Sequence, residues 1–121
     1  MIAHIVLFAP KPGLKESEQQ SFAQSFQEAC RGIPAIRRAR IGSILELNAA
    51  PALVVGDSPY SAAAVMEFDD YIGLQAYLKH PLHEVLGKLF WQYCGATLVI
   101  DAEMGDPKTE DVGSLFGLKT E

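Results

Sequence analysis

The sequence has few cysteines, no excess of basic charge and no long apolar run, and each shortage argues against a class of protein. Its 121 residues include two cysteines, without CxxC or zinc-ligand spacing, which favours buried free thiols over a disulfide or zinc framework. Ten basic against fifteen acidic residues give a net charge of −5, which argues against nucleic acid or an anionic membrane as the main partner. The apolar stretch IAHIVLFA stops at Pro10, too soon for a membrane span.

The sequence also lacks the motifs of cofactor chemistry. It has no glycine-rich phosphate loop and no serine-nucleophile motif. His80 and His83 are three residues apart, but Pro81 interrupts the spacing and no cysteine or carboxylate completes a standard metal set. Haem would need an axial histidine and a larger pocket. We therefore predict no metal and no other cofactor, and we expect a cytoplasmic protein because the N-terminus has no basic targeting segment and both thiols are free.

The hydrophobic pattern predicts one α+β domain. It covers residues 1–103 and is followed by a polar, glycine-rich tail, 104–121, in which Ser114–Leu118 is the one part that can dock. Asp69 or Asp70 is expected to cap a helix, Pro81 to break it and start the next, and Gly95 to end that one. Strands are expected at 1–10, within 35–47, at 61–70 and at 96–103, helices at about 17–31, 71–79 and from 81, and a loop over 48–60 with an extended piece at Leu53–Val55.

This order is β-α-β-β-α-β, the ferredoxin-like arrangement with a four-stranded antiparallel sheet and helices on one face. A sheet covered on one side should be polar on the other, yet both faces of the first and last strands are apolar. The chain has no spare helix for the second face. We therefore predict a homodimer in which two sheets stack into an α/β barrel.

The stretch YLKHPLHEVLG, Tyr77–Gly87, holds the main candidates for chemistry. Helical spacing places His83 at the margin of the apolar stripe, near Phe90, and Gly87 leaves space beside it. A half-buried imidazole there can act as acid or base near neutrality, with Tyr77 as its partner and His4 across the pocket. The alternative is structural: His83 bonded to a carbonyl, His80 as a helix boundary or N-cap, and Tyr77 as a core residue.

HIVLFAPKPG, VMEFDDYIGLQAYLKHPLHEVL and LVIDAE together resemble the stress-responsive A/B barrel domain family of the dimeric α/β barrel superfamily, over residues 2–103. The most specific parts are the histidine of the first strand and the Y-x-x-H-P-x-H pattern. The resemblance implies a ferredoxin-like fold and a homodimeric barrel. The best understood relative, the plant polyketide cyclase olivetolic acid cyclase, closes a ring without metal or organic cofactor.

The pocket positions of that cyclase match His4, Tyr77 and His83 here, whereas Phe26 stands where the cyclase has another tyrosine. These three residues are the catalytic candidates, and Phe26, His80 and Phe90 are the ligand-binding candidates.

Three functions follow from these residues. The first is binding of a small organic molecule between helices and sheet, with undetermined activity. The second is a cofactor-free acid–base enzyme acting on a carbonyl compound, cyclase- or isomerase-like, with His83 as base. The third is a structural or interaction role in stress tolerance. An open cavity containing His4, Tyr77 and His83 favours the enzyme, and a space filled by the side chains Phe26, Phe90 and Trp91 argues against it.

Overall fold

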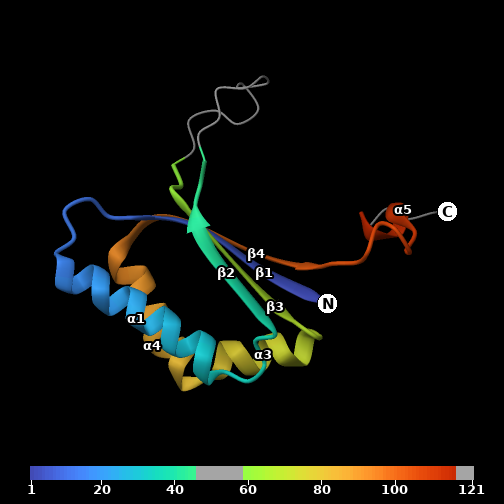
Figure 1. The fold of residues 1–121 in the computed structure, drawn as a ribbon, viewed down its shortest axis with the longest axis horizontal. Helices are drawn as coiled ribbons and strands as arrows, with labels where there is room; N and C mark the ends of the chain where they lie inside the picture. Colours follow the sequence, from blue (N-terminus) through green and yellow to red (C-terminus); the bar gives the residue numbers. More distant parts are fainter. Residues whose placement is uncertain (46–58, 117–121) are drawn as a thin grey trace.

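Four antiparallel strands form one sheet in this computed structural model, which describes residues 1–45 and 59–116 (Figure 1). The strand order is β2-β3-β1-β4, so the first and third strands lie in the centre. The predicted ferredoxin-like arrangement is confirmed, including the break of the second helix at Pro81. The elements are β1 (Ile2–Pro10), α1 (Glu16–Gly32), β2 (Arg38–Ser43), β3 (Ala62–Phe68), α3 (Tyr71–Lys79), α4 (Pro81–Tyr93), β4 (Cys94–Glu103) and α5 (Val112–Leu115).

The helices α1, α3 and α4 lie on one side of the sheet (Figure 1), and the core fills the space between these two layers. Side chains alternate along each strand, so every second residue of β1 and β3 points toward the helices. Burying these apolar side chains supplies the main drive for folding. The largest core cluster consists of Ala29, Ile33, Met66, Phe68, Leu74, Tyr77 and Leu86.

The opposite face of the sheet carries apolar side chains that no described helix covers. Ile5 of β1 lies between Val65 of β3 and Ile100 of β4 in the strand register. Ile100 is 45% exposed and Leu98, two residues earlier on the same face, is 40% exposed.

None of the helices described is long and apolar enough to cross a bilayer.

His80 and Pro81 change the direction of the chain between α3 and α4. The backbone N–H of His80 donates to the carbonyl of Tyr77 at 3.1 Å, which closes α3. The Nδ1 of His80 accepts a hydrogen bond from the N–H of Leu82 at 3.1 Å, and Pro81 occupies the first position of α4, where no N–H is needed. His80 is therefore an N-cap, as the structural alternative for this residue proposed.

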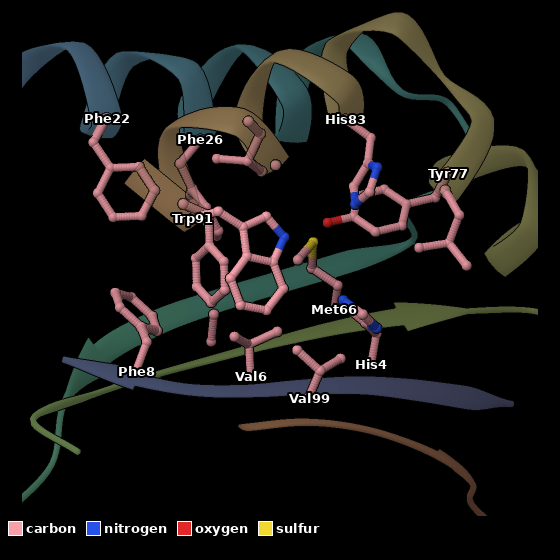
Figure 2. A pocket seen from close by; sticks show the side chains of 15 residues that line it. His4, Val6, Phe8, Phe22, Phe26, Met66, Tyr77, His83, Trp91 and Val99 are labelled. Carbon is pink, nitrogen blue, oxygen red and sulfur yellow. The ribbon is translucent and has the colours of Figure 1, made fainter. Parts of the chain in front are cut away.

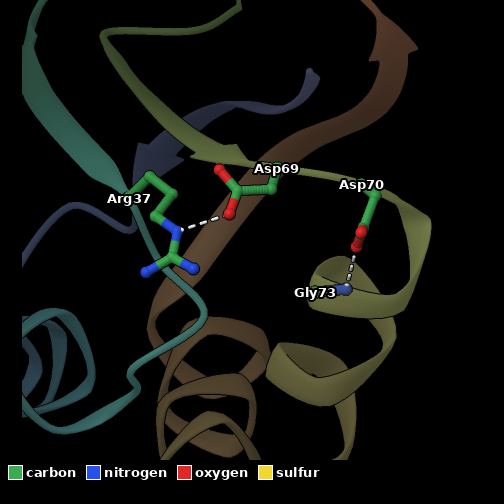
Figure 3. A network of polar contacts seen from close by, with 4 residues as sticks. All are labelled: Arg37, Asp69, Asp70 and Gly73. Atoms are coloured by element: carbon green, nitrogen blue, oxygen red, sulfur yellow. Dashed lines mark hydrogen bonds and ion pairs between the residues drawn. The ribbon is translucent and has the colours of Figure 1, made fainter.

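The two adjacent aspartates before α3 have different roles (Figure 3). The carboxylate of Asp70 accepts a hydrogen bond from the N–H of Gly73 at 2.9 Å and caps the helix. The carboxylate of Asp69 pairs with Arg37 at 2.8 Å, with both side chains more than half exposed.

Two local predictions differ from the structure or fall outside it. Gly95 does not end α4. The backbone of Cys94 is already extended, and Cys94 is the first residue of β4, where it pairs with Pro10 of β1. The extended piece expected at Leu53–Val55 lies outside the described residues.

In the tail, Asp111 caps the short helix α5, which lies beyond the C-terminal end of β4 (Figure 1).

Replacing Asp70 by Ala should lower the free energy of unfolding by about 1 kcal/mol, because the first turn of α3 loses its cap. The matched control is Asp69→Ala, which removes an exposed ion pair and should cost less than about 0.5 kcal/mol. Urea denaturation of both variants measures the difference. Equal losses would show that the cap does not stabilise α3.

Candidate functional site

A cavity of about 210 Å³ lies between the sheet and the helices (Figure 2). Its volume equals that of about seven water molecules in the liquid. Trp91 and Val99 in its wall are 66% and 45% exposed, which places its opening between α4 and β4. It is lined by His4, Val6, Phe8, Phe22, Phe26, Ala64, Met66, Tyr77, Leu78, His83, Leu86, Gly87, Phe90, Trp91 and Val99.

The three predicted catalytic residues meet at one end of this cavity. The Tyr77 ring packs edge-on against His83, with 4.5 Å between ring centroids, and against His4, with 5.4 Å. Figure 2 shows these rings at one end and Phe8, Phe22 and Phe26 at the other. The cavity therefore has a polar end and an aromatic end.

The break at Pro81 brings Tyr77 and His83 together. The two residues are six apart, so on one straight helix they would point about 120° away from each other because each residue turns the chain by about 100°. The turn at His80 instead sets α4 at a new angle and lets the two rings touch. A Cβ added to Gly87 would lie 4.0 Å from the His83 ring, so a longer side chain there would project into the space beside the imidazole.

Asp101 holds His4 in place. The Nδ1 of His4 lies 2.5 Å from a carboxylate oxygen of Asp101, its partner in the β1–β4 register, and His4 is only 5% exposed. A carboxylate in this position fixes the orientation of the imidazole and selects the tautomer with the proton on Nδ1.

The sequence prediction did not include Asp101 among the site residues. One feature of the sequence indicated it. Asp101 is two residues after Val99, so both side chains lie on the same face of β4, and the rest of this strand is mostly apolar.

The Tyr77 hydroxyl faces the cavity. Every fully buried polar side-chain atom of the described residues has a hydrogen-bond partner, and the Tyr77 hydroxyl makes no hydrogen bond within that part of the chain. Figure 2 shows the Tyr77 oxygen directed toward the cavity, and the residue as a whole is 2% exposed. Burial raises the pKa of the Tyr77 phenol, and the acidic groups of Cys30 and Asp101 raise it further. The phenol stays protonated and can donate to a ligand.

His83 has the opposite shift. Burial lowers its pKa below the usual value of 6.5, the charge that His4 can carry lowers it further, and a hydrogen bond with the backbone of Leu78 opposes both effects. At neutral pH the imidazole is therefore uncharged and can accept a proton. The imidazole of His83, a neutral proton acceptor, therefore contacts the ring of Tyr77, a neutral hydrogen-bond donor, at the polar end of the cavity.

The other predicted residues divide into two groups. Phe26 and Phe90 line the cavity, together with Trp91, and leave it open rather than filling it. His80 is not among the lining residues and serves as the cap of α4. No group of three or more His, Cys, Asp or Glu side chains in the described residues is arranged to hold a metal ion.

We predict that His83 titrates below pH 6.5 in an NMR titration of its ring signals. Replacing His4 by Gln should raise this pKa part of the way, because the charge of His4 is removed while burial, the larger cause, remains. A wild-type pKa at or above 6.5 would contradict this description of the site.

The same shift predicts a change of stability with pH. Because the folded state has the lower pKa, the contribution of neutral His83 is complete above about pH 6.5 and is lost as the pH falls through the folded pKa. Denaturation at about pH 7.5 and about pH 5 should show a smaller loss of stability for His83→Gln than for the wild type. An equal loss would exclude His83 as a source of acid sensitivity.

The fold has many solved counterparts. A hydroxynitrile lyase from Passiflora edulis is similar with a TM-score of 0.73 and 16% identity, covering 87% of this chain and 94% of that one. A protein from Arabidopsis thaliana has a TM-score of 0.71 at 16% identity, with 88% and 97% covered. A Dabb family protein from Mesorhizobium loti, described as having a ferredoxin-like fold, has a TM-score of 0.65 at 21% identity, with 86% and 97% covered.

At these identities the likeness shows the fold alone. A search of curated proteins found no match. The profile of the stress responsive A/B barrel domain matches residues 2–104, which span the whole unit from β1 to β4. The chain therefore belongs to the stress responsive A/B barrel domain family.

Proposed function

We propose that this protein binds a small, uncharged, mostly apolar organic molecule in the cavity. The observation that carries the proposal is the separation of the lining into an apolar body and one polar end. No lysine or arginine of the described residues lines the cavity, so nothing in this lining would neutralise a phosphate or a carboxylate. A ligand with one oxygen-bearing head and an apolar body matches this distribution.

The polar end supports a catalytic role for the same site. His83 as a neutral acceptor can take a proton from the carbon next to a carbonyl group, and the Tyr77 hydroxyl can donate a hydrogen bond to the oxygen that becomes an enolate. The proton then returns from His83 to another carbon of the same compound, as in an isomerase. In a cyclase, the enolate carbon instead attacks a second carbonyl, and the oxygen of that carbonyl takes the proton from His83 as it becomes a hydroxyl group. No outside oxidant or metal is required by either step.

His4 acts as a second polar group, with its imidazole held by Asp101. A hydroxynitrile lyase among the proteins with this fold supports choosing an enzyme over a purely structural role.

We also propose that the protein is a homodimer. The uncovered sheet face carries Ile5, Leu98 and Ile100, and the same face of a second copy would cover it by two-fold stacking. Dimeric ferredoxin-like proteins of this fold from Thermobifida fusca and Bacteroides fragilis support this assembly.

We further propose a cytoplasmic location, which the two free cysteines, Cys30 and Cys94, support.

Ligand binding and catalysis can be measured separately. Trp91 is the one tryptophan of the chain and lines the cavity, so its fluorescence reports binding of a small ketone such as 2-heptanone. Proton NMR in D₂O then follows exchange of the hydrogens next to the carbonyl. We expect catalysed exchange by the wild type and a loss of about 10²- to 10⁴-fold in His83→Gln and Tyr77→Phe.

Retained binding in these two variants would show that they fold and keep the cavity. Binding without exchange in the wild type would leave a binding protein and exclude this enzymatic role. Absence of both, in a folded protein, would favour the structural role.

Analytical ultracentrifugation tests the assembly. The wild type should sediment as two 121-residue chains, and Ile100→Asp should sediment as a monomer because it places a charge on the apolar sheet face. Val85→Asp, at an exposed apolar position of α4, is the matched control and should remain dimeric. A monomeric wild type at micromolar concentration would refute the homodimer.

A further inference from the structure

The chain after β4 folds into a separate hook, residues 104–116, which we call the arm. Figure 1 shows it beyond the C-terminal end of β4, apart from the helix layer. The arm closes on itself at Gly105, where an added Cβ would meet the side chains of Glu110 and Leu115. Phe116, at its end, is 72% exposed. A folded segment that stands apart from its own domain is available for contact with a second molecule.

The arm is acidic. It contains three carboxylates and one cation, at Asp106, Glu110, Asp111 and Lys108, so its net charge is −2. All four side chains are exposed, and none forms an ion pair within the described residues. The hydrogen bonds that the three carboxylates accept come from backbone N–H groups of the arm itself. The negative charge is therefore not neutralised by the protomer that carries it.

The edge of the sheet farthest from β4 is basic. β2 places Arg38 and Arg40 on the face that no described helix covers, because Ala39 between them packs against the core on the helix side. Both arginines are exposed. In the described part of the chain Arg38 forms no ion pair, even with its neighbour Glu67, and Arg40 donates to the carbonyl of Ala39 at 2.8 Å. We call Arg38 and Arg40 the basic edge.

The strand register places the basic edge and the start of the arm at the same end of the sheet. One row across the four strands consists of Arg38, Glu67, Ala3 and Ala102. The next row on the same face runs from Arg40 to Ile100. The arm therefore begins two residues beyond the row of Arg38. Within one chain, β2 and β4 are three strand spacings apart, about 14 Å, so the arm leaves from the edge opposite the arginines.

Two sheets stacked face to face around a two-fold axis can be arranged in two ways. An axis across the strands places β2 of one copy over β2 of the other, so the arginines of both copies face one another. An axis along the strands places β2 over β4 of the partner and keeps the rows at the same height. Arg38 then faces Ala102 of the partner subunit, close to the start of the partner's arm. Charge favours this second arrangement, because it separates like charges and brings opposite charges together.

We propose that the arm of each protomer binds the basic edge of its partner, with the dimer axis along the strands. Carboxylates of the arm pair with the partner subunit's Arg38 and the partner subunit's Arg40, and the two-fold axis repeats this contact at the other edge. The inference rests on the proposed homodimer and adds the direction of its axis and the charges that select it. Nearly all of the arm lies beyond the family domain, which ends at residue 104.

Two charge-reversed variants of the full chain test this contact. The first combines Arg38→Glu with Arg40→Glu and makes the basic edge acidic. The second combines Thr109→Lys with Glu110→Lys, which gives the arm a net positive charge and keeps the hydrogen bonds of Asp106 and Asp111. Each variant alone brings like charges together, so its dimer dissociation constant in sedimentation equilibrium should be at least about tenfold above that of the wild type.

An equimolar mixture of the two variants should recover the affinity of the wild type to within about threefold. In a mixed dimer the acidic arm of the first variant meets the intact arginines of the second, and the basic arm of the second meets the new glutamates of the first. Both contacts are then restored, which a contact within one chain would not allow. Recovery also shows that both variants are folded.

Arg31→Glu combined with Lys88→Glu is the matched control. Both residues are exposed on the helix layer, and the pair changes the net charge as much as reversal of the basic edge does. This variant should dimerise like the wild type.

Wild-type affinity in both reversed variants would overturn the arm contact and leave the homodimer intact. A mixture that dimerises as weakly as the separate variants would have the same consequence. A monomeric wild type would overturn the homodimer and, with it, the arm contact.

Discussion

The contact between the Tyr77 and His83 rings depends on the break at His80–Pro81, and the rest of the site depends on that contact. A continuous helix would turn the two side chains apart. The imidazole of His80 satisfies the exposed N–H of Leu82, so the break leaves no unpaired donor at this position of α4. His80 therefore contributes to the site through the backbone that it stabilises, although it does not line the cavity.

Burial gives the two rings complementary properties. Removing a phenol from water favours its neutral form, and removing an imidazole from water also favours its neutral form. For Tyr77 the neutral form is the donor, and for His83 it is the acceptor. One apolar environment thus prepares a proton donor and a proton acceptor side by side, without a lysine or carboxylate in the described lining. The carboxylate of Asp101 is bound to His4 on the sheet side.

The sequence predicts the fold well because its signals are local and repeated. Strand alternation, the helical stripe and the proline at position 81 each indicate an element by themselves. Prediction of the site was less complete because it requires relations between elements. The spacing of Tyr77 and His83 does not give the angle at Pro81, and nothing near Asp101 in the sequence indicates that its register partner is His4. The prediction that Gly95 ends α4 was wrong for a related reason. Cys94 pairs with Pro10 of β1, so the helix ends one residue earlier, at Tyr93.

The edge strand β4 carries side chains that matter on both faces of the sheet. Its side chains alternate, so Ile100 points to the uncovered face while Asp101, the next residue, points to His4. β4 pairs with β1 on one side only, and the uncovered face leaves Ile100 exposed in the single chain. Packing a second copy on that face would restrict β4 and thereby the carboxylate that orients His4. In the proposed dimer, the partner subunit therefore has a physical route to the site through β4, even though the cavity itself lies on the opposite face.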